Sequence, residues 1–211
     1  RDEGVEFPIH TEPERQEDCY SGEWTNWQMA AIPIKSLGRE LVDNMADMAH
    51  FGPIHYSKVK SFRNTMEGHK FVQYMVGGHQ ILTEGDGALI TSVATYEGPA
   101  YMTTTMTGLM DGHPMTTHLL VSHIPVDMEN FIINFGVMMK KDPNISEAGN
   151  KAMVEEYTEK NIESFHQDVA IWNNKCIIDN PSMCDGDGPV HLVRKWYSQF
   201  MTDVADIQDD Q

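Results

Sequence analysis

Four polar residues in one short segment, Asn44, Asp47, His50 and His55, have types and a spacing that could bind a metal ion. Two neutral imidazoles and one carboxylate can bind Fe(II) on one side of the ion and leave its remaining positions open. Open positions are what O₂ and a reacting substrate require. The segment therefore predicts two of the three ligands of a mononuclear iron site, in which a carboxylate completes the set.

The element expected to position these residues is a helix over 36–51, because its apolar residues recur at helical spacing and Ser36 can cap it. Such a helix carries Asn44, Asp47 and His50 along one face. Gly52-Pro53 is expected to end the helix, since proline disfavours helical backbone at the residue before it. The break would turn the chain so that His55 reaches the same point as His50.

The interval between the two histidines is weak evidence when taken alone. His113/His118 and His118/His123 have the same spacing. Both pairs lie in or beside a predicted strand, where residues five apart point to opposite faces. Those pairs are poor chelates, so a metal site at the first pair needs further support.

That support is a family resemblance. The order Asn44-x-x-Asp47-x-x-His50-x₄-His55 resembles the iron-binding signature of the Rieske non-haem iron oxygenases at all four positions. Residues 165–175 (FHQDVAIWNNK) resemble the family's third-ligand helix. The stretch 178–197 is similar to the oxygenase components of 3-ketosteroid 9α-hydroxylases and their near relatives. The resemblance covers roughly 35–211.

The resemblance implies a mononuclear Fe(II) held by His50, His55 and Asp168. It also implies that Asp47 links an iron ligand to the [2Fe–2S] Rieske cluster of a neighbouring subunit in a homotrimer, and that Asn44 lies near the iron without binding it tightly. The implied reaction is the hydroxylation of a steroid ring by a monooxygenase. Its electrons come from a reductase that contains flavin and ferredoxin-type centres.

Three alternatives remain open at this point. A related oxygenase of the same family could act on another polycyclic or aromatic substrate. A lipid- or sterol-binding module without activity would use the same sheet and helices, and its histidines would be incidental. A zinc hydrolase could use two histidines and a carboxylate, but its usual helical HExxH motif is missing from the sequence.

Candidate cavity residues come from the positions around the predicted ligands. On the expected helix around Asp168, one face also carries residues at i−7, i−3 and i+4. With residues from the strands and from the first helix, the predicted substrate-contacting set is Met45, Gln73, Tyr101, Asn161, Phe165 and Trp172. The 15 methionines suit an adaptable apolar cavity.

The remaining chain predicts an α+β fold, a curved antiparallel sheet with helices packed against it in a helix-grip arrangement. Strands are expected where β-branched and aromatic residues gather: 70–76, 88–96, 100–109, 115–126 and 130–140. A long helix is expected over 151–175, with Ser146 near its start, and a last helix over 190–207.

Composition narrows the classes of partner. The formal net charge is −17, which disfavours a nucleic-acid partner, and no apolar run approaches the length that crosses a bilayer. Three cysteines without a CxxC pair favour a reducing cytoplasm.

Two regions are expected from composition and from the resemblance. Residues 1–34 read as an acidic leader or linker, and 35–211 as the iron-binding catalytic domain. No Cys-x-His…Cys-x-x-His set occurs in the sequence. The cluster is therefore expected in an upstream domain that these residues do not include.

Overall fold

A computed structural model describes residues 20–79, 81–83, 88–110, 112–176, 178–184 and 186–203, without the side chain of Met110. Its centre is a seven-stranded antiparallel sheet in the order β1-β7-β6-β5-β4-β3-β2. The strands are β1 (Gln28–Ile34), β2 (Val59–Glu67), β3 (Lys70–Gly77), β4 (Ile90–Glu97), β5 (Tyr101–Met110), β6 (His113–Pro125) and β7 (Phe131–Met139). Apart from the edge strand β1, each strand pairs with its neighbour in the chain.

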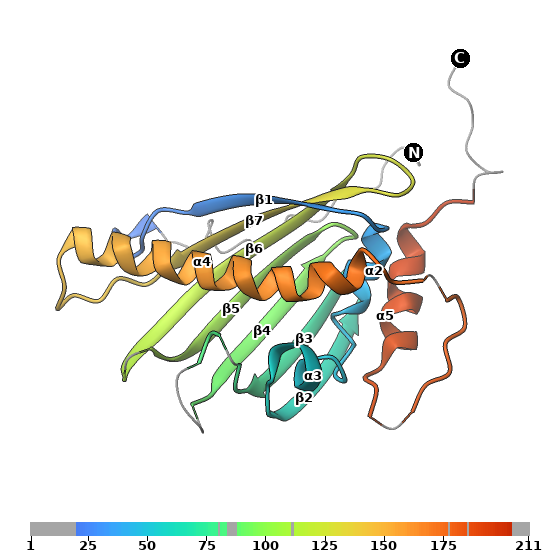
Figure 1. The fold of residues 1–211 in the computed structure, drawn as a ribbon, viewed down its shortest axis with the longest axis horizontal. Helices are drawn as coiled ribbons and strands as arrows, with labels where there is room; N and C mark the ends of the chain where they lie inside the picture. Colours follow the sequence, from blue (N-terminus) through green and yellow to red (C-terminus); the bar gives the residue numbers. More distant parts are fainter. Residues whose placement is uncertain are drawn as a thin grey trace, which may run out of the picture.

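Within the described residues, the helices include α2 (Gly38–Asp43), α3 (Phe51–His55), α4 (Glu147–Trp172) and α5 (Val190–Tyr197), which a 3-10 turn, Ser198–Phe200, extends. Figure 1 shows α4 lying across one face of the sheet, with its C-terminal end beside α2. Among the described residues, no helix combines the length and the apolar character needed to cross a membrane.

The core lies between α4 and the sheet. Along β3, buried and partly buried residues alternate, because successive side chains of a strand point to opposite faces. Most buried residues of α4 lie three, four or seven positions apart, which gives the helix one inward stripe. A second buried cluster packs Val42 of α2, Trp196 of α5 and Phe71 of β3 together. This cluster holds the two shorter helices against the end of the sheet.

The α+β class, the antiparallel sheet and the long helix are confirmed. All five predicted strands form, with ends that differ by a few residues. Ser146 caps α4, and its Oγ accepts a hydrogen bond from the backbone N–H of Gly149 at 3.1 Å. The last helix is shorter than predicted: α5 ends at Tyr197, and residues 204–207 of that prediction lie outside the described residues.

Two strands were not predicted. β1 lies within the stretch expected to be a leader, and its whole length pairs with β7. β2 is an edge strand, and its nine residues include no fully buried side chain. Neither segment has the strong apolar alternation by which a strand is recognised in a sequence.

His123 provides a pH prediction for the core. Burial lowers the pKa of its imidazole to about 4, whereas an unfolded chain titrates near pH 6.5. Between these values the unfolded state binds a proton that the folded state does not, so acidification is expected to destabilise the protein by up to about 3 kcal/mol. Urea titrations from pH 7 to pH 4 should show a shallower loss for His123→Phe.

The control for that prediction is His191→Phe, because His191 is exposed on α5. This variant should follow the pH profile of the unsubstituted protein. Parallel profiles for His123→Phe and the unsubstituted protein would show that His123 does not contribute.

Candidate metal centre

The segment that carries Asn44, Asp47 and His50 is not one helix, contrary to the sequence prediction. α2 ends at Asp43, and its N-cap is Leu37 rather than Ser36, without a side-chain cap. Residues 44–46 form a turn, and α3 begins at Phe51. Asn44, Asp47 and His50 therefore do not share a helix face; they lie on the connection between two short helices.

Two residues beyond the end of α2, side chains from the sheet bind a backbone carbonyl that a longer helix would use. The backbone oxygen of Met45 accepts hydrogen bonds from Asn64 Nδ2 at 2.7 Å and from Gln73 Nε2 at 3.0 Å. These donors come from β2 and β3, so they replace the N–H that a continuing helix would supply. The sheet thus fixes the backbone between Asn44 and Asp47.

Gly52-Pro53 does not stop a helix; it lies in the first turn of α3. Proline is tolerated there because the first N–H groups of a helix have no partner within the helix. His50 is the N-cap of α3 and His55 its last residue. Tyr56 then adopts a left-handed conformation, with φ 47°, which ends the helix.

The structure brings the three predicted iron ligands together. One ligand atom from each of His50, His55 and Asp168 lies within 4.8 Å of those of the other two. His55 Nε2 is 3.4 Å from Asp168 Oδ2, and both residues are buried. Asp168 comes from the C-terminal part of α4, so the ligands meet between α3 and α4. Two imidazoles and a carboxylate form the donor set that suits Fe(II).

Hydrogen bonds orient both imidazoles with Nε2 toward this point. His50 Nδ1 donates to the backbone oxygen of Asp47 at 2.7 Å, and His55 Nδ1 donates to Gln167 Oε1 at 2.8 Å. Because Nδ1 carries the proton in each ring, Nε2 keeps the lone pair that binds a metal. The chain therefore fixes the tautomers that iron binding requires.

Neighbouring charges also shift the pKa values of two residues at the centre, His55 and Asp47. Burial by itself lowers the pKa of His55, but the hydrogen bond and charge of Asp168 outweigh it and raise that pKa above its ordinary value. Burial by itself raises the pKa of Asp47, but contacts with His50 outweigh it and lower that pKa. Asp47 is thus held as an anion beside His50, with its side chain 37% exposed.

A cavity lies beside these ligands. Five of the six predicted substrate-contacting residues line it: Met45, Gln73, Asn161, Phe165 and Trp172. Asn44 also lines it and accepts a hydrogen bond from Trp172 Nε1 at 3.4 Å. The remaining lining is largely apolar and includes Leu41, Met75, Leu82, Ile90, Met102 and Met106.

Tyr101 is the exception, because it does not line the cavity. On β5, Met102, Thr104 and Met106 face the cavity, so the odd-numbered residues point to the other side of the sheet. The tyrosine that does line the cavity is Tyr96, whose hydroxyl is buried and has no hydrogen-bond partner among the described residues. Tyr96 was not predicted from the sequence, although strand alternation distinguishes it from Tyr101 once the register is known.

His79 was also missed. It is buried, lines the cavity and stacks on the ring of His55 with centroids 4.8 Å apart. Burial, followed by the charges of His55 and His50, lowers the pKa of His79 to about 3. Because His79 lies far in sequence from residues 44–55, no local spacing pattern connects it to the predicted metal site.

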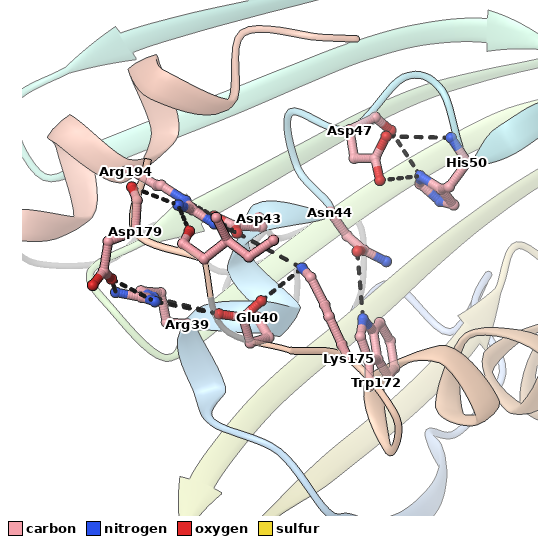
Figure 2. Close-up of polar contacts among 11 residues, drawn as sticks. Arg39, Glu40, Asp43, Asn44, Asp47, His50, Trp172, Lys175, Asp179 and Arg194 are labelled. Atoms are coloured by element: carbon pink, nitrogen blue, oxygen red, sulfur yellow. Dashed lines mark hydrogen bonds and ion pairs between the residues drawn. The ribbon is translucent and has the colours of Figure 1, made fainter. Parts of the chain in front are cut away.

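An ionic cluster joins α2 to Lys175, which follows α4, and to Arg194 of α5 (Figure 2). Lys175 Nζ is 2.7 Å from Glu40 Oε2 and 3.7 Å from Asp43 Oδ2. Arg194 Nη2 from α5 is 2.7 Å from Asp43 Oδ2. Glu40 is fully buried, so these cations offset the cost of removing its charge from water.

Lys175→Met is expected to destabilise the protein by about 3 kcal/mol, because it leaves the buried carboxylate of Glu40 without its shortest ion pair. Urea denaturation at neutral pH measures this change. Lys151→Met is the matched control: Lys151 forms an exposed pair with Glu155 on α4 at 3.6 Å, which contributes less than about 1 kcal/mol. Equal losses in the two variants would contradict the role assigned to Lys175.

Comparison with known proteins decides the family. Residues 2–201 match the family described as the 3-ketosteroid 9α-hydroxylase C-terminal domain. The chain belongs to that family. A 3-ketosteroid-9-alpha-monooxygenase oxygenase component from Rhodococcus rhodochrous is 41% identical over 195 residues, which cover 89% of this chain and 50% of that protein. The corresponding protein of Mycobacterium tuberculosis is 36% identical, over 92% of this chain and 52% of that protein.

This member of the 3-ketosteroid 9α-hydroxylase C-terminal domain family thus spans about half the length of the relatives it matches. Solved structures agree on the fold. Pseudomonas putida NdmA with caffeine gives a TM-score of 0.60 at 13% identity, over 90% of this chain and 54% of that one. Dicamba monooxygenase bound to dicamba gives 0.55 at 13% identity, over 83% and 58%.

Proposed function

We propose that this chain is the iron-binding catalytic domain of a monooxygenase that hydroxylates a 3-ketosteroid ring at the 9α position. The overall reaction is R–H + O₂ + 2e⁻ + 2H⁺ → R–OH + H₂O. The observation that carries the proposal is the convergence of His50, His55 and Asp168 within 4.8 Å beside a largely apolar cavity. The family to which the chain belongs supports the steroid and the position of the hydroxyl group.

A ferrous ion held by these three residues would supply the centre at which O₂ is reduced. The chain's own residues position the groups around it. His50 and His55 present Nε2, Asp168 supplies the anionic ligand, and Asn44 accepts the Trp172 hydrogen bond that fixes one wall of the cavity. Apolar side chains of the sheet and of α4 exclude water and accommodate the steroid skeleton.

Electrons must reach the iron from outside this chain. We propose that they come one at a time from a reductase with flavin and ferredoxin-type centres, through a [2Fe–2S] cluster in another part of the protein. Asp47 is the proposed link, because its partly exposed carboxylate lies 3.6 Å from His50 Nδ1. In this proposal, the cluster belongs to a neighbouring subunit of a homotrimer, and the assembly works in the cytoplasm.

The test supplies oxidant and electrons together. Hydrogen peroxide can replace O₂ and two electrons, since R–H + H₂O₂ → R–OH + H₂O is balanced. The Fe(II)-loaded protein, androst-4-ene-3,17-dione and ¹⁸O-labelled peroxide should give a hydroxysteroid that contains the label, by mass spectrometry. Zn(II)-loaded protein and Asp168→Ala should give none.

A second measurement does not depend on turnover. Addition of the steroid to the Co(II)-substituted protein should change the visible absorption of the metal, because the cavity adjoins the ligands. An unchanged spectrum together with no labelled product would contradict the proposal. Steroid binding of equal strength with and without metal would instead favour a sterol-binding module, and hydrolysis with zinc would favour the hydrolase.

A further inference from the structure

We propose that His79 is a positioning residue for the iron ligand His55, and that its ring is a fixed surface that sets the rotation of the His55 imidazole. The inference rests on the proposed iron site. It assigns a role to a buried histidine that is not one of the three ligands.

The first observation is the contact between the two rings. The imidazoles of His55 and His79 stack with centroids 4.8 Å apart and planes 26° apart. Both residues are buried, at 5% and 8% exposure. A near-parallel stacked contact opposes rotation of His55 about its χ2 bond, because rotation would drive one ring edge toward the neighbouring ring.

The second observation is that His79 is itself held at both nitrogens. Its Nδ1 accepts hydrogen bonds from the backbone N–H groups of Ile81 and Leu82, at 3.2 and 3.3 Å. With Nδ1 as acceptor, the neutral ring carries its proton on Nε2. Nε2 therefore donates to Ser164 Oγ, which is 3.0 Å away. A flipped ring would lose these bonds, so a single orientation of His79 is favoured.

The backbone around His79 is fixed as well. Thr83 Oγ1 accepts from the backbone N–H of His79 at 2.9 Å and donates to its carbonyl oxygen at 2.7 Å. In the described part of the connection that follows β3, residues 81–83 thus hold both the ring and the backbone of His79. A side chain that only filled space in the cavity would not need this set of bonds.

The third observation is that the contacts return to the helix that supplies Asp168. Ser164 lies one turn before Asp168 on α4, and Gln167, which binds His55 Nδ1, immediately precedes it. One stretch of α4 therefore supplies the anionic ligand Asp168. The same stretch holds the imidazole of His55 through Gln167 and that of His79 through Ser164. The geometry of the three iron ligands depends on this shared support.

The experiment compares metal affinities measured by competition with a chelator under anaerobic conditions, for Fe(II) and for Co(II). His79→Ala removes the ring and its bonds, His79→Phe keeps a ring but not the bonds, and Ser164→Ala removes one bond. Outer partners of metal ligands affect affinity by about 10- to 100-fold. We expect a loss in that range for His79→Ala, smaller losses for the other two, and an altered Co(II) absorption spectrum in all three.

The matched control is His166→Ala, which removes an exposed histidine from the same helix and should leave affinity and spectrum unchanged. Circular dichroism establishes that each variant is folded. If His79→Ala does not fold, His79→Phe and Ser164→Ala provide the test. Folded variants with unchanged affinity and an unchanged Co(II) spectrum would overturn the inference.

Failure of the proposed function has a different signature. In that case the unsubstituted protein would bind no stoichiometric Fe(II), or His55→Ala would bind it equally well. In the other case, His55→Ala loses Fe(II), but the His79 and Ser164 variants keep the metal affinity and Co(II) spectrum of the unsubstituted protein. That result would overturn the positioning role and leave the oxygenase proposal standing.

Discussion

Replacing Asp168 by alanine is expected to abolish stoichiometric Fe(II) binding. The substitution removes the carboxylate of a proposed ligand set whose other two members are imidazoles. Loss of an outer partner of a ligand costs about 10- to 100-fold in affinity, so loss of the ligand itself should cost more than about 100-fold. After anaerobic loading and desalting, colorimetric iron analysis should find about one ion per unsubstituted chain and almost none in the variant.

The control for this experiment is on the same helix. Glu163 is an exposed carboxylate of α4, so Glu163→Ala removes an equal charge and should keep its iron. His50→Ala should lose iron as Asp168→Ala does. Iron that is indifferent to both ligand substitutions would contradict the triad and, with it, the oxygenase proposal.

Gly188→Ala is expected to be the most destabilising small substitution near the site. A Cβ at this position would lie 1.7 Å from the backbone oxygen of Ala46 and 2.8 Å from its carbonyl carbon. Both partners are backbone atoms, so no side-chain rotation relieves the overlap. We expect a loss of about 3 kcal/mol, the upper end of what overpacking typically costs. Urea denaturation measures it, and iron analysis should show a weakened centre, since Ala46 lies between Asn44 and Asp47.

Gly186→Ala is the matched control in the same loop. A Cβ there meets only Cys184 Sγ, at 3.8 Å, which is an ordinary contact. Its urea midpoint should stay close to that of the unsubstituted protein. Equal midpoints for the Gly188 and Gly186 variants would show that the loop moves away from Ala46 without cost.

Much of the fold follows from local pattern, and the exceptions have physical reasons. β3 was predictable because β-branched and aromatic residues gather in it. The helix over 36–51 was predicted too long, because Asn64 and Gln73 bind the Met45 carbonyl. Those two donors belong to strands that come later in the sequence. No property of residues 36–51 reveals that competition.

The candidate site likewise contains some residues that could be predicted from local pattern and others that could not. The spacing of His50 and His55 and the family resemblance singled out three side chains that do lie together, and helical spacing around Asp168 singled out Phe165 and Trp172, which line the cavity. His79 and Tyr96 could not be found by spacing, because they reach the cavity through the register of the sheet and a connection after β3. Tyr101 was the wrong tyrosine for the same reason.

If the proposed function holds, the arrangement of α4 has a consequence for how the substrate range can change. The same helix contributes Asp168 and two walls of the cavity, Phe165 and Trp172, so a substitution that moves the helix also moves a ligand. Ser92 and Ala94 on β4 line the cavity from the sheet, where no ligand is attached. Variation in substrate range is therefore least constrained on the strands, and a library that aims at new substrates should begin there.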